Sequence, residues 1–352
     1  MDGEMGHFSH VSFAARTDVG KKRKNNEDAF GAFPSSGVYC VADGMGGGAD
    51  GEIASAATIK AVEDAIGLLP VIEDGGFPAA KVAERAEVAL GKASEWIWKR
   101  SKEKKLGGCG STFVGVVLDA TDPGKALAIH SGDSRLYLVH GKKIKQITRD
   151  HSVAELMGEK DENKVNPMFR SMVVNAVGIR EKVDVERTSF KIATGDKILV
   201  CSDGLSKMVA DKRIASIISG SETVEDASDA LITAALEAGG IDNVTLVLCD
   251  IGELPSPLRP IEIPSQEALK TAADDAETDD GGSDSTKVLP QKPVMIARRV
   301  ATGKSSRRQP RFQLTMTIGL VSLLALMLVF LAVAIFVNHR NSQPKVISVQ
   351  EK

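Results

Sequence analysis

The sequence contains few cysteines and has no large excess of charge of either sign. Its 4 cysteines lie far apart among 352 residues, form no CxxC pair, and fall mostly inside apolar runs. This spacing favours buried, reduced thiols over disulfides or a zinc site. The formal net charge of -3 gives no general reason to expect a nucleic-acid partner. The N-terminal MDGEMGHFSH also lacks the basic and apolar regions of a cleavable signal peptide.

One long apolar run lies near the C-terminus. Leu314–Val337 has 24 residues and no charged side chain, which is about 36 Å as a helix. We therefore expect a single transmembrane helix. The flank before it carries Arg298, Arg299, Lys304, Arg307, Arg308 and Arg311, and the flank after it carries Arg340, Lys345 and Lys352. By the positive-inside rule, the N-terminal part is expected in the cytoplasm, and residues 338–352 as a short extracytoplasmic tail.

Residues 8–252 are expected to form one domain. Apolar, strand-like runs recur between turn signals: GVYCVAD, STFVGVVLD, KALAIHS, SRLYLVH, DKILVCSD and NVTLVLCDI. Helical periodicity is found in EIASAATIKAVEDAIG, FPAAKVAERAEVALGKASEWIWKRSKEK, DKRIASII and TVEDASDALITAALEAG. Helices between blocks of strands favour antiparallel sheets covered by helices. From Glu253 the composition becomes Pro-rich, then acidic, then basic, which predicts a disordered linker over residues 253–313.

Three acidic residues adjoin apolar runs and are followed by Gly or Asn: Asp43, Asp203 and Asp242. Carboxylates that the fold brings together from distant positions repel one another unless cations share them. Oxygen ligands of this kind favour Mg²⁺ or Mn²⁺. The sequence therefore predicts a metal site of these three residues.

Two other segments carry residues that this chemistry could use. Arg23, in RKNNED, could hold two phosphate oxygens as a fork, while Glu27 and Asp28 orient metal-bound waters. A solvated loop is the alternative. Asp133, in GDSR between two strand-like runs, is either a further carboxylate near the same sheet edge or an ordinary turn residue.

The glycine-rich stretch after Asp43 also fits the GxGxxA dinucleotide-binding pattern, with Glu63 at a suitable distance. We reject that interpretation because Asp43 would face an anionic pyrophosphate, and the other Asp residues would have no role. The glycines are better explained as giving a cation access to a backbone carbonyl, that of Gly44.

Taken together, these motifs resemble a known family. RKNNED, VADGMGG, GDSR, DHS, NAVG, CSDGL and DNVT occur in the order and spacing of the PPM family, the metal-dependent type 2C serine/threonine protein phosphatases. The chain resembles a bacterial member over about residues 8–252. The resemblance implies an α+β fold in which two antiparallel sheets pack as a sandwich with helices on both outer faces (α-β-β-α). With the C-terminal span, this is the predicted architecture.

The resemblance also implies a metal ligand set. Asp43 would bridge two ions, the Gly44 carbonyl would complete one shell, and Asp203 and Asp242 would hold the other ion. Glu27 and Asp28 would act through bound water.

In bacterial members a third metal is held with the residue that matches Asp133, and Arg23 matches the phosphate-binding arginine. The stretch from about residue 152 to 175 resembles a mobile flap. Met45 and Gly48 stand where some relatives carry a histidine, so the general acid is unassigned. His151 is either close to the site or a structural hydrogen-bonding residue.

The implied reaction is hydrolysis of a phosphate ester. Two cations would lower the pKa of a bridging water, and the hydroxide would attack phosphorus in line while Arg23 offsets the developing charge. A cysteine nucleophile is not expected, because Gly115 rather than Arg follows Cys109 by six residues, and no DxDxT aspartyl motif occurs.

We therefore expect a phosphoserine/phosphothreonine protein phosphatase in the cell membrane, using Mn²⁺ or Mg²⁺ and acting on phosphoproteins such as a membrane Ser/Thr kinase and its substrates. The alternative is an inactive, phosphatase-like adaptor that binds phosphoproteins in the same cleft.

Overall fold

The structure is a computed structural model, and it describes residues 8–46, 49–67, 69, 75–104, 108–157, 172–257 and 259–260. The chain divides into two units, Met1–Arg299 and Val300–Lys352, and all described residues belong to the first. The predicted span Leu314–Val337, the tail and most of the predicted linker lie outside the described residues. Among the helices that are described, none is long and apolar enough to cross a membrane.

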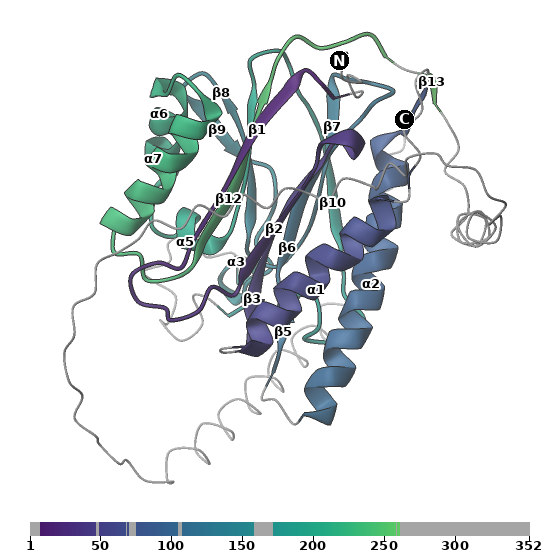
Figure 1. The fold of residues 1–352 in the computed structure, drawn as a ribbon, viewed down its shortest axis with the longest axis vertical. Coiled ribbons are helices and arrows are strands. Elements are labelled where there is room, and N and C mark those ends of the chain that lie inside the picture. Colours follow the sequence, from purple (N-terminus) through teal and green to yellow (C-terminus); the bar gives the residue numbers. More distant parts are fainter. Residues whose placement is uncertain are drawn as a thin grey trace, which may run out of the picture. The chain divides into compact units, whose positions relative to one another are not determined.

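Two antiparallel sheets form the centre of the described part (Figure 1). The first has the strand order β1 (Val11–Asp18), β12 (Val244–Ile251), β11 (Lys197–Cys201), β8 (Arg135–His140), β9 (Lys143–Gln146). The second has the order β10 (Glu186–Lys191), β7 (Lys125–Ser131), β6 (Phe113–Leu118), β3 (Val38–Met45), β2 (Asp28–Phe33), and β5 (Gly110–Ser111) also pairs with β3. Two residues of the predicted linker, β13 (Arg259–Pro260), pair in parallel with β4 (Gly75–Gly76).

Helices cover the outer face of each sheet. α1 (Ala49–Ile66) and α2 (Ala79–Glu103) pack on the second sheet, whereas α6 (Asp211–Gly220) and α7 (Val224–Glu237) pack on the first (Figure 1). The short helices η1 (Pro34–Ser36), α3 (Val153–Leu156) and α5 (Asp203–Ser206) lie in connections. The predicted α+β fold, two antiparallel sheets flanked by helices, is confirmed for this part of the chain.

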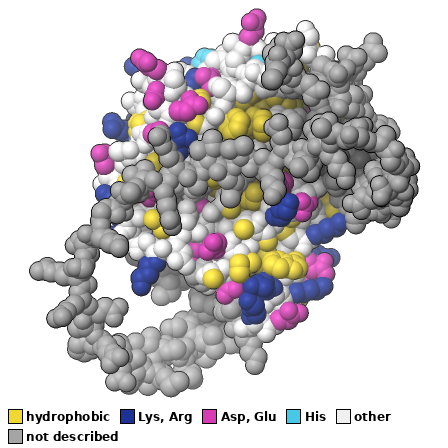
Figure 2. Space-filling view, viewed as in Figure 1, with side chains coloured by type: hydrophobic (Ala, Val, Ile, Leu, Met, Phe, Trp, Pro, Cys, Tyr) yellow, Lys and Arg dark blue, Asp and Glu magenta, His cyan; other side chains and the backbone are white. Residues whose placement is uncertain are grey.

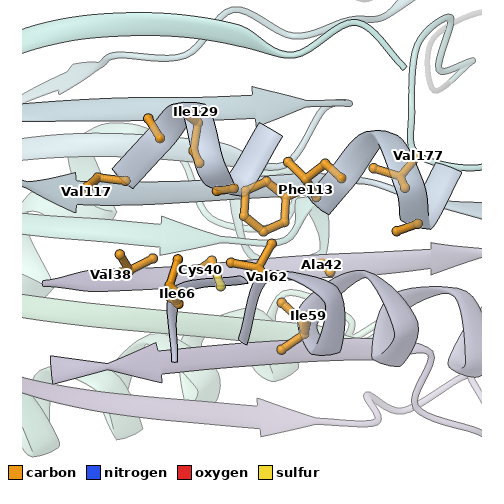
Figure 3. Packing of buried hydrophobic residues seen from close by; sticks show 14 of the residues in the cluster. Val38, Cys40, Ala42, Ile59, Val62, Ile66, Phe113, Val117, Ile129 and Val177 are labelled. Carbon is orange, nitrogen blue, oxygen red and sulfur yellow. The ribbon is translucent and has the colours of Figure 1, made fainter. Parts of the chain in front are cut away.

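Three apolar layers hold these elements together. One lies between α1, α2 and the second sheet, one between the two sheets, and one between the first sheet and α6 and α7. Strand β3 serves two of them, because Cys40 belongs to the first layer and Val41 to the second. Figure 3 shows side chains of β3 beside those of α1 in the first layer. Inner strands are buried on both faces, which explains why they are continuous apolar runs rather than alternating ones.

The burial of the cysteines and the distribution of surface charge both agree with what the composition predicted. All four cysteines are buried and free, as their spacing predicted. On the face drawn in Figure 2, basic and acidic side chains are interspersed over the described residues. This mixture of signs is what a net charge close to zero leads one to expect.

Candidate active site

Strands β2 and β3 place two of the predicted carboxylates next to each other. Asp28, the first residue of β2, is the direct partner of Asp43 in the antiparallel pairing. Asp43 does not end its strand, since β3 continues to Met45. Its backbone is held by Thr112, whose Oγ1 accepts from the Asp43 N–H (3.0 Å) and whose N–H donates to the Asp43 carbonyl (2.8 Å).

Three more carboxylates reach the same place from other elements. Asp203 begins α5 just after β11, Asp242 comes two residues before β12, and Asp133 lies in the turn between β7 and β8. Burial raises the pKa of Asp43 well above its usual range, and the negative charges of Asp28, Asp203, Asp133 and Asp242 raise it further. The fold therefore brings five predicted site carboxylates into one electrostatic cluster.

The surroundings of Asp28 show whether this cluster suits a metal ion. Burial raises its pKa to about 7, against the opposing effect of hydrogen bonds from Thr245 and Ser202. Ser202 Oγ donates to Asp28 Oδ2 at 2.8 Å, whereas Asp28 Oδ1 is buried and has no hydrogen-bond partner among the described residues. A buried carboxylate oxygen without a donor, in a cluster of oxygen ligands, fits a hard divalent cation.

Two basic side chains pair with the cluster. Arg23, from the loop between β1 and β2, places Nη2 2.8 Å from Asp242 Oδ2, and its side chain is 48% exposed. Lys207 places Nζ 2.9 Å from Asp133 Oδ2 and 2.5 Å from Asp203 Oδ2. Arg23 was predicted from the sequence, but Lys207 was not. The only signal for Lys207 was its position four residues after Asp203, one helical turn away.

Asn243 fixes the loop that carries Arg23. Its Oδ1 accepts from the Glu27 N–H at 2.8 Å, and its Nδ2 donates to the carbonyls of Val19 and Asn25, both at 2.9 Å. The side chain of Asn243 therefore ties residues 19–27 to the start of β12, next to Asp242. The motif DNVT was part of the resemblance, but nothing in it assigned this role to Asn243.

The glycines that follow Asp43 and Asp203 are required by close packing of the backbone. A Cβ on Gly44 would lie 2.1 Å from the Gly51 carbonyl oxygen and 2.5 Å from that of Glu27. A Cβ on Gly204 would lie 1.9 Å from the Asn243 carbonyl oxygen. Both Asp-Gly pairs are thus explained by contacts within the chain, and the role of the Gly44 carbonyl as a metal ligand stays a prediction.

His151 is held as a structural residue. Its Nδ1 accepts from the Gly132 N–H (3.2 Å) and from Asn175 Nδ2 (2.9 Å), which leaves the proton on Nε2, 3.3 Å from Glu186 Oε2. His130, His151 and Glu186 also offer ligand atoms within 4.8 Å of one another. Because Nε2 of His151 carries a proton in this network, these three residues fit a hydrogen-bonded support better than a metal site. Gly48 and residues 158–171 of the predicted flap lie outside the described residues.

Comparison with known proteins identifies the family. Residues 20–237 match the sequence profile described as protein phosphatase 2C. The serine/threonine phosphatase stp of Listeria monocytogenes is 32% identical over 253 residues, covering 68% of this chain and 95% of the relative. The serine/threonine protein phosphatase PstP of Mycobacterium tuberculosis is 34% identical over 247 residues, covering 68% of this chain and 45% of the relative.

A solved structure shows the same fold with metal. The catalytic domain of PstP in complex with 2 manganese ions superimposes with a TM-score of 0.58 at 32% identity, covering 69% of this chain and 99% of that one. The sheets and the carboxylate cluster thus define a metal-dependent hydrolase. The chain belongs to the protein phosphatase 2C family, bacterial type, and its enzyme class is protein-serine/threonine phosphatase. The predicted cofactor, Mn²⁺ or Mg²⁺, agrees with the ions in that relative.

Proposed function

We propose that this chain hydrolyses phosphoserine and phosphothreonine in proteins with divalent ions held by Asp43, Asp203 and Asp242. The observation that carries the proposal is the convergence of five carboxylates from both sheets, with a buried oxygen of Asp28 that lacks a donor among the described residues. Bound Mn²⁺ or Mg²⁺ would supply Lewis-acid charge and lower the pKa of water. The named serine/threonine phosphatases among its relatives support the same substrate class.

The chain's own residues would bind and orient the phosphate. Arg23 is half exposed and lies in the field of Asp242, Glu27 and Asp43, so its guanidinium can take a phosphate dianion as a further partner beside Asp242. Glu27 and Asp28 would accept hydrogen bonds from ordered water. Asn243 keeps the loop with Arg23 and Glu27 at a fixed distance from Asp242.

The test is metal dependence of the purified full chain. We expect no phosphate release from a phosphothreonine peptide after chelation, recovery with Mn²⁺, and little recovery with Zn²⁺, because the predicted ligands are all oxygen. Asp43→Asn should remain inactive with Mn²⁺, with turnover lower by about 10²–10³-fold or more. Full activity in excess chelator would contradict the proposal. Binding of the peptide without phosphate release in Mn²⁺ would instead support the adaptor alternative.

We further propose that Leu314–Val337 anchors the enzyme in the cell membrane with its catalytic domain in the cytoplasm. The support is the length of this apolar run and the basic flank of residues 298–311, which would lie against the anionic leaflet at about 1 kcal/mol per basic residue. The linker of residues 253–313 would let the enzyme reach membrane-bound phosphoproteins, including a transmembrane Ser/Thr kinase and its substrates. Tethering would raise their effective concentration without changing the chemistry.

A further inference from the structure

Lys207 joins two carboxylates of the cluster through a single nitrogen. Its Nζ contacts Oδ2 of Asp133 and Oδ2 of Asp203, at 2.9 and 2.5 Å. The three side chains are largely buried, with 28% of Lys207, 5% of Asp133 and 16% of Asp203 exposed. Charge-assisted hydrogen bonds of this length, shielded from water, are among the stronger polar interactions in a protein.

The position of Lys207 follows from the local backbone. α5 begins at Asp203, and the Lys207 N–H donates to the Asp203 carbonyl at 2.8 Å, so both side chains leave the same face one turn apart. Asp133 is brought to this face by the turn between β7 and β8, which run in different sheets. The ammonium group therefore sits where the two sheets meet.

A third metal ion does not fit this arrangement. The family resemblance implies that Asp133 helps hold such an ion, and Asp203 is the carboxylate that Lys207 places next to it. An ion bound by the same two oxygens would have to occupy the place of the ammonium group. An ion on their other oxygens would face a positive charge a few ångströms away, in a largely buried site where water screens that charge only in part.

We propose that Lys207 takes the place of a third metal ion in this chain. The inference rests on the proposed site of two ions, and it makes Lys207 a positioning residue. Because Lys207 holds Oδ2 of Asp203, the other oxygen of that carboxylate would serve the two-ion site, and the ammonium group would neutralise Asp133 without an ion. The enzyme then needs two divalent ions rather than three.

The experiment is a count of bound Mn²⁺ in the full chain. The metal-free protein is titrated with Mn²⁺, and free Mn²⁺ is followed by electron paramagnetic resonance. We expect about two ions per chain in the wild type, as in the relative with 2 manganese ions. Lys207→Met, which keeps the length of the side chain but not its charge, should bind a third ion at least about tenfold more tightly than the wild type does.

Three further variants make the result specific. Lys212→Met removes an exposed lysine from α6 and should leave the count at about two. Lys207→Arg retains a cation and should do the same. Lys207→Met combined with Asp133→Asn should lose the third ion again, because the new site has lost a ligand. If Lys207→Met is too unstable without metal, its melting temperature should rise more steeply with Mn²⁺ than that of the wild type.

The outcomes separate this inference from the proposed function. Three ions in the wild type, one of them lost in Asp133→Asn, would overturn the role of Lys207 and leave the phosphatase proposal intact. An unchanged count in Lys207→Met would overturn it as well. A wild-type chain that binds no Mn²⁺ at all would instead overturn the two-ion site on which the inference depends.

Discussion

Single residues in this site are best understood through the charge that each one faces. Arg23 lies beside Asp242 but is half exposed, so it can accept a second anion. Lys207 lies between Asp133 and Asp203 and is largely buried, so its charge is already matched. We therefore expect the two cations to have different roles: Arg23 to bind substrate, and Lys207 to stabilise the carboxylate cluster.

Arg23→Ala should raise KM for a phosphothreonine peptide by about 10-fold or more and change kcat less, because the proposed role of the guanidinium is to bind phosphate and not to activate the attacking water. Arg23→Lys should restore only part of this loss, since an ammonium group cannot form the two-pronged contact. Steady-state kinetics with saturating Mn²⁺ measure both parameters. Lys24→Ala removes an exposed charge from the same loop and is the control. Unchanged kinetics in Arg23→Ala would show that phosphate binds elsewhere.

The cysteines should be inert in the native protein. Burial raises the pKa of Cys40 and of Cys201 to about 12, and raises that of Cys249 further. We expect iodoacetamide at pH 8 to label these thiols only after unfolding, as measured by mass spectrometry. Because unfolded thiols ionise near pH 8.5 while the buried ones stay protonated, they should also make stability fall as pH rises from about 9 to 12. Rapid labelling of Cys201 in the folded enzyme would argue against this packing.

At the scale of elements, the inner strands of both sheets could be predicted from the sequence, whereas the edge strands could not. The six apolar runs identified in the sequence became β3, β6, β7, β8, β11 and β12, the strands with a neighbour on each side. Of the strands that were not predicted, β1, β2, β9 and β10 are the edges of the two sheets, and β4, β5 and β13 have only two residues each. An edge strand such as β10 is largely exposed, so its sequence need not be apolar and offers little signal.

The candidate site could likewise be predicted only in part: its strand-associated acidic residues could be identified, but its long-range contacts could not. Asp43 lies in β3, Asp203 follows β11 and Asp242 precedes β12, and all three are inner strands, so the position of each residue beside an apolar run could be predicted from the sequence. The ion pair of Lys207 with Asp133 spans 74 positions in the sequence, and no local pattern indicates a contact over that distance. The same holds for Asn243, whose partner Glu27 lies 216 positions away.

Asn243→Ala should loosen the whole segment that precedes β2. The substitution removes three hydrogen bonds that hold residues 19–27, and it leaves the backbone groups of Glu27, Val19 and Asn25 without these partners. We expect unfolding free energy to fall by about 1–3 kcal/mol and Mn²⁺ affinity to fall with it. Chemical denaturation and Mn²⁺ titration measure these changes. Asn25→Ala, which keeps its carbonyl contact and loses only an exposed side chain, should change neither.

At the scale of the whole molecule, the catalytic unit and the predicted anchor should be separable. Deleting residues 312–352 should yield a soluble enzyme whose turnover of a small phosphopeptide is unchanged, because none of the predicted site residues is removed. Fractionation of cells that express each form measures the distribution. Full-length protein found in the soluble fraction would contradict the anchor.

The side of the membrane on which the catalytic domain lies can be measured separately. Protease added outside intact cells should leave the catalytic domain whole, since the basic flank of residues 298–311 is expected on the cytoplasmic side. Digestion of that domain would show that the orientation is reversed. Cells opened before treatment are the control, because the protease then reaches both sides.

The pairing of β1 with β12 constrains how the protein is made. β1 starts at Val11, and among the described strands its one neighbour in the sheet is β12, which ends at Ile251. During synthesis β1 therefore stays unpaired until more than two hundred further residues have been added. Pairing of two strands so far apart in the sequence is slow, and until it occurs β1 exposes unpaired backbone groups that can aggregate. A chain truncated before Val244 should therefore be insoluble, and the nascent chain should need chaperones until β12 has been synthesised.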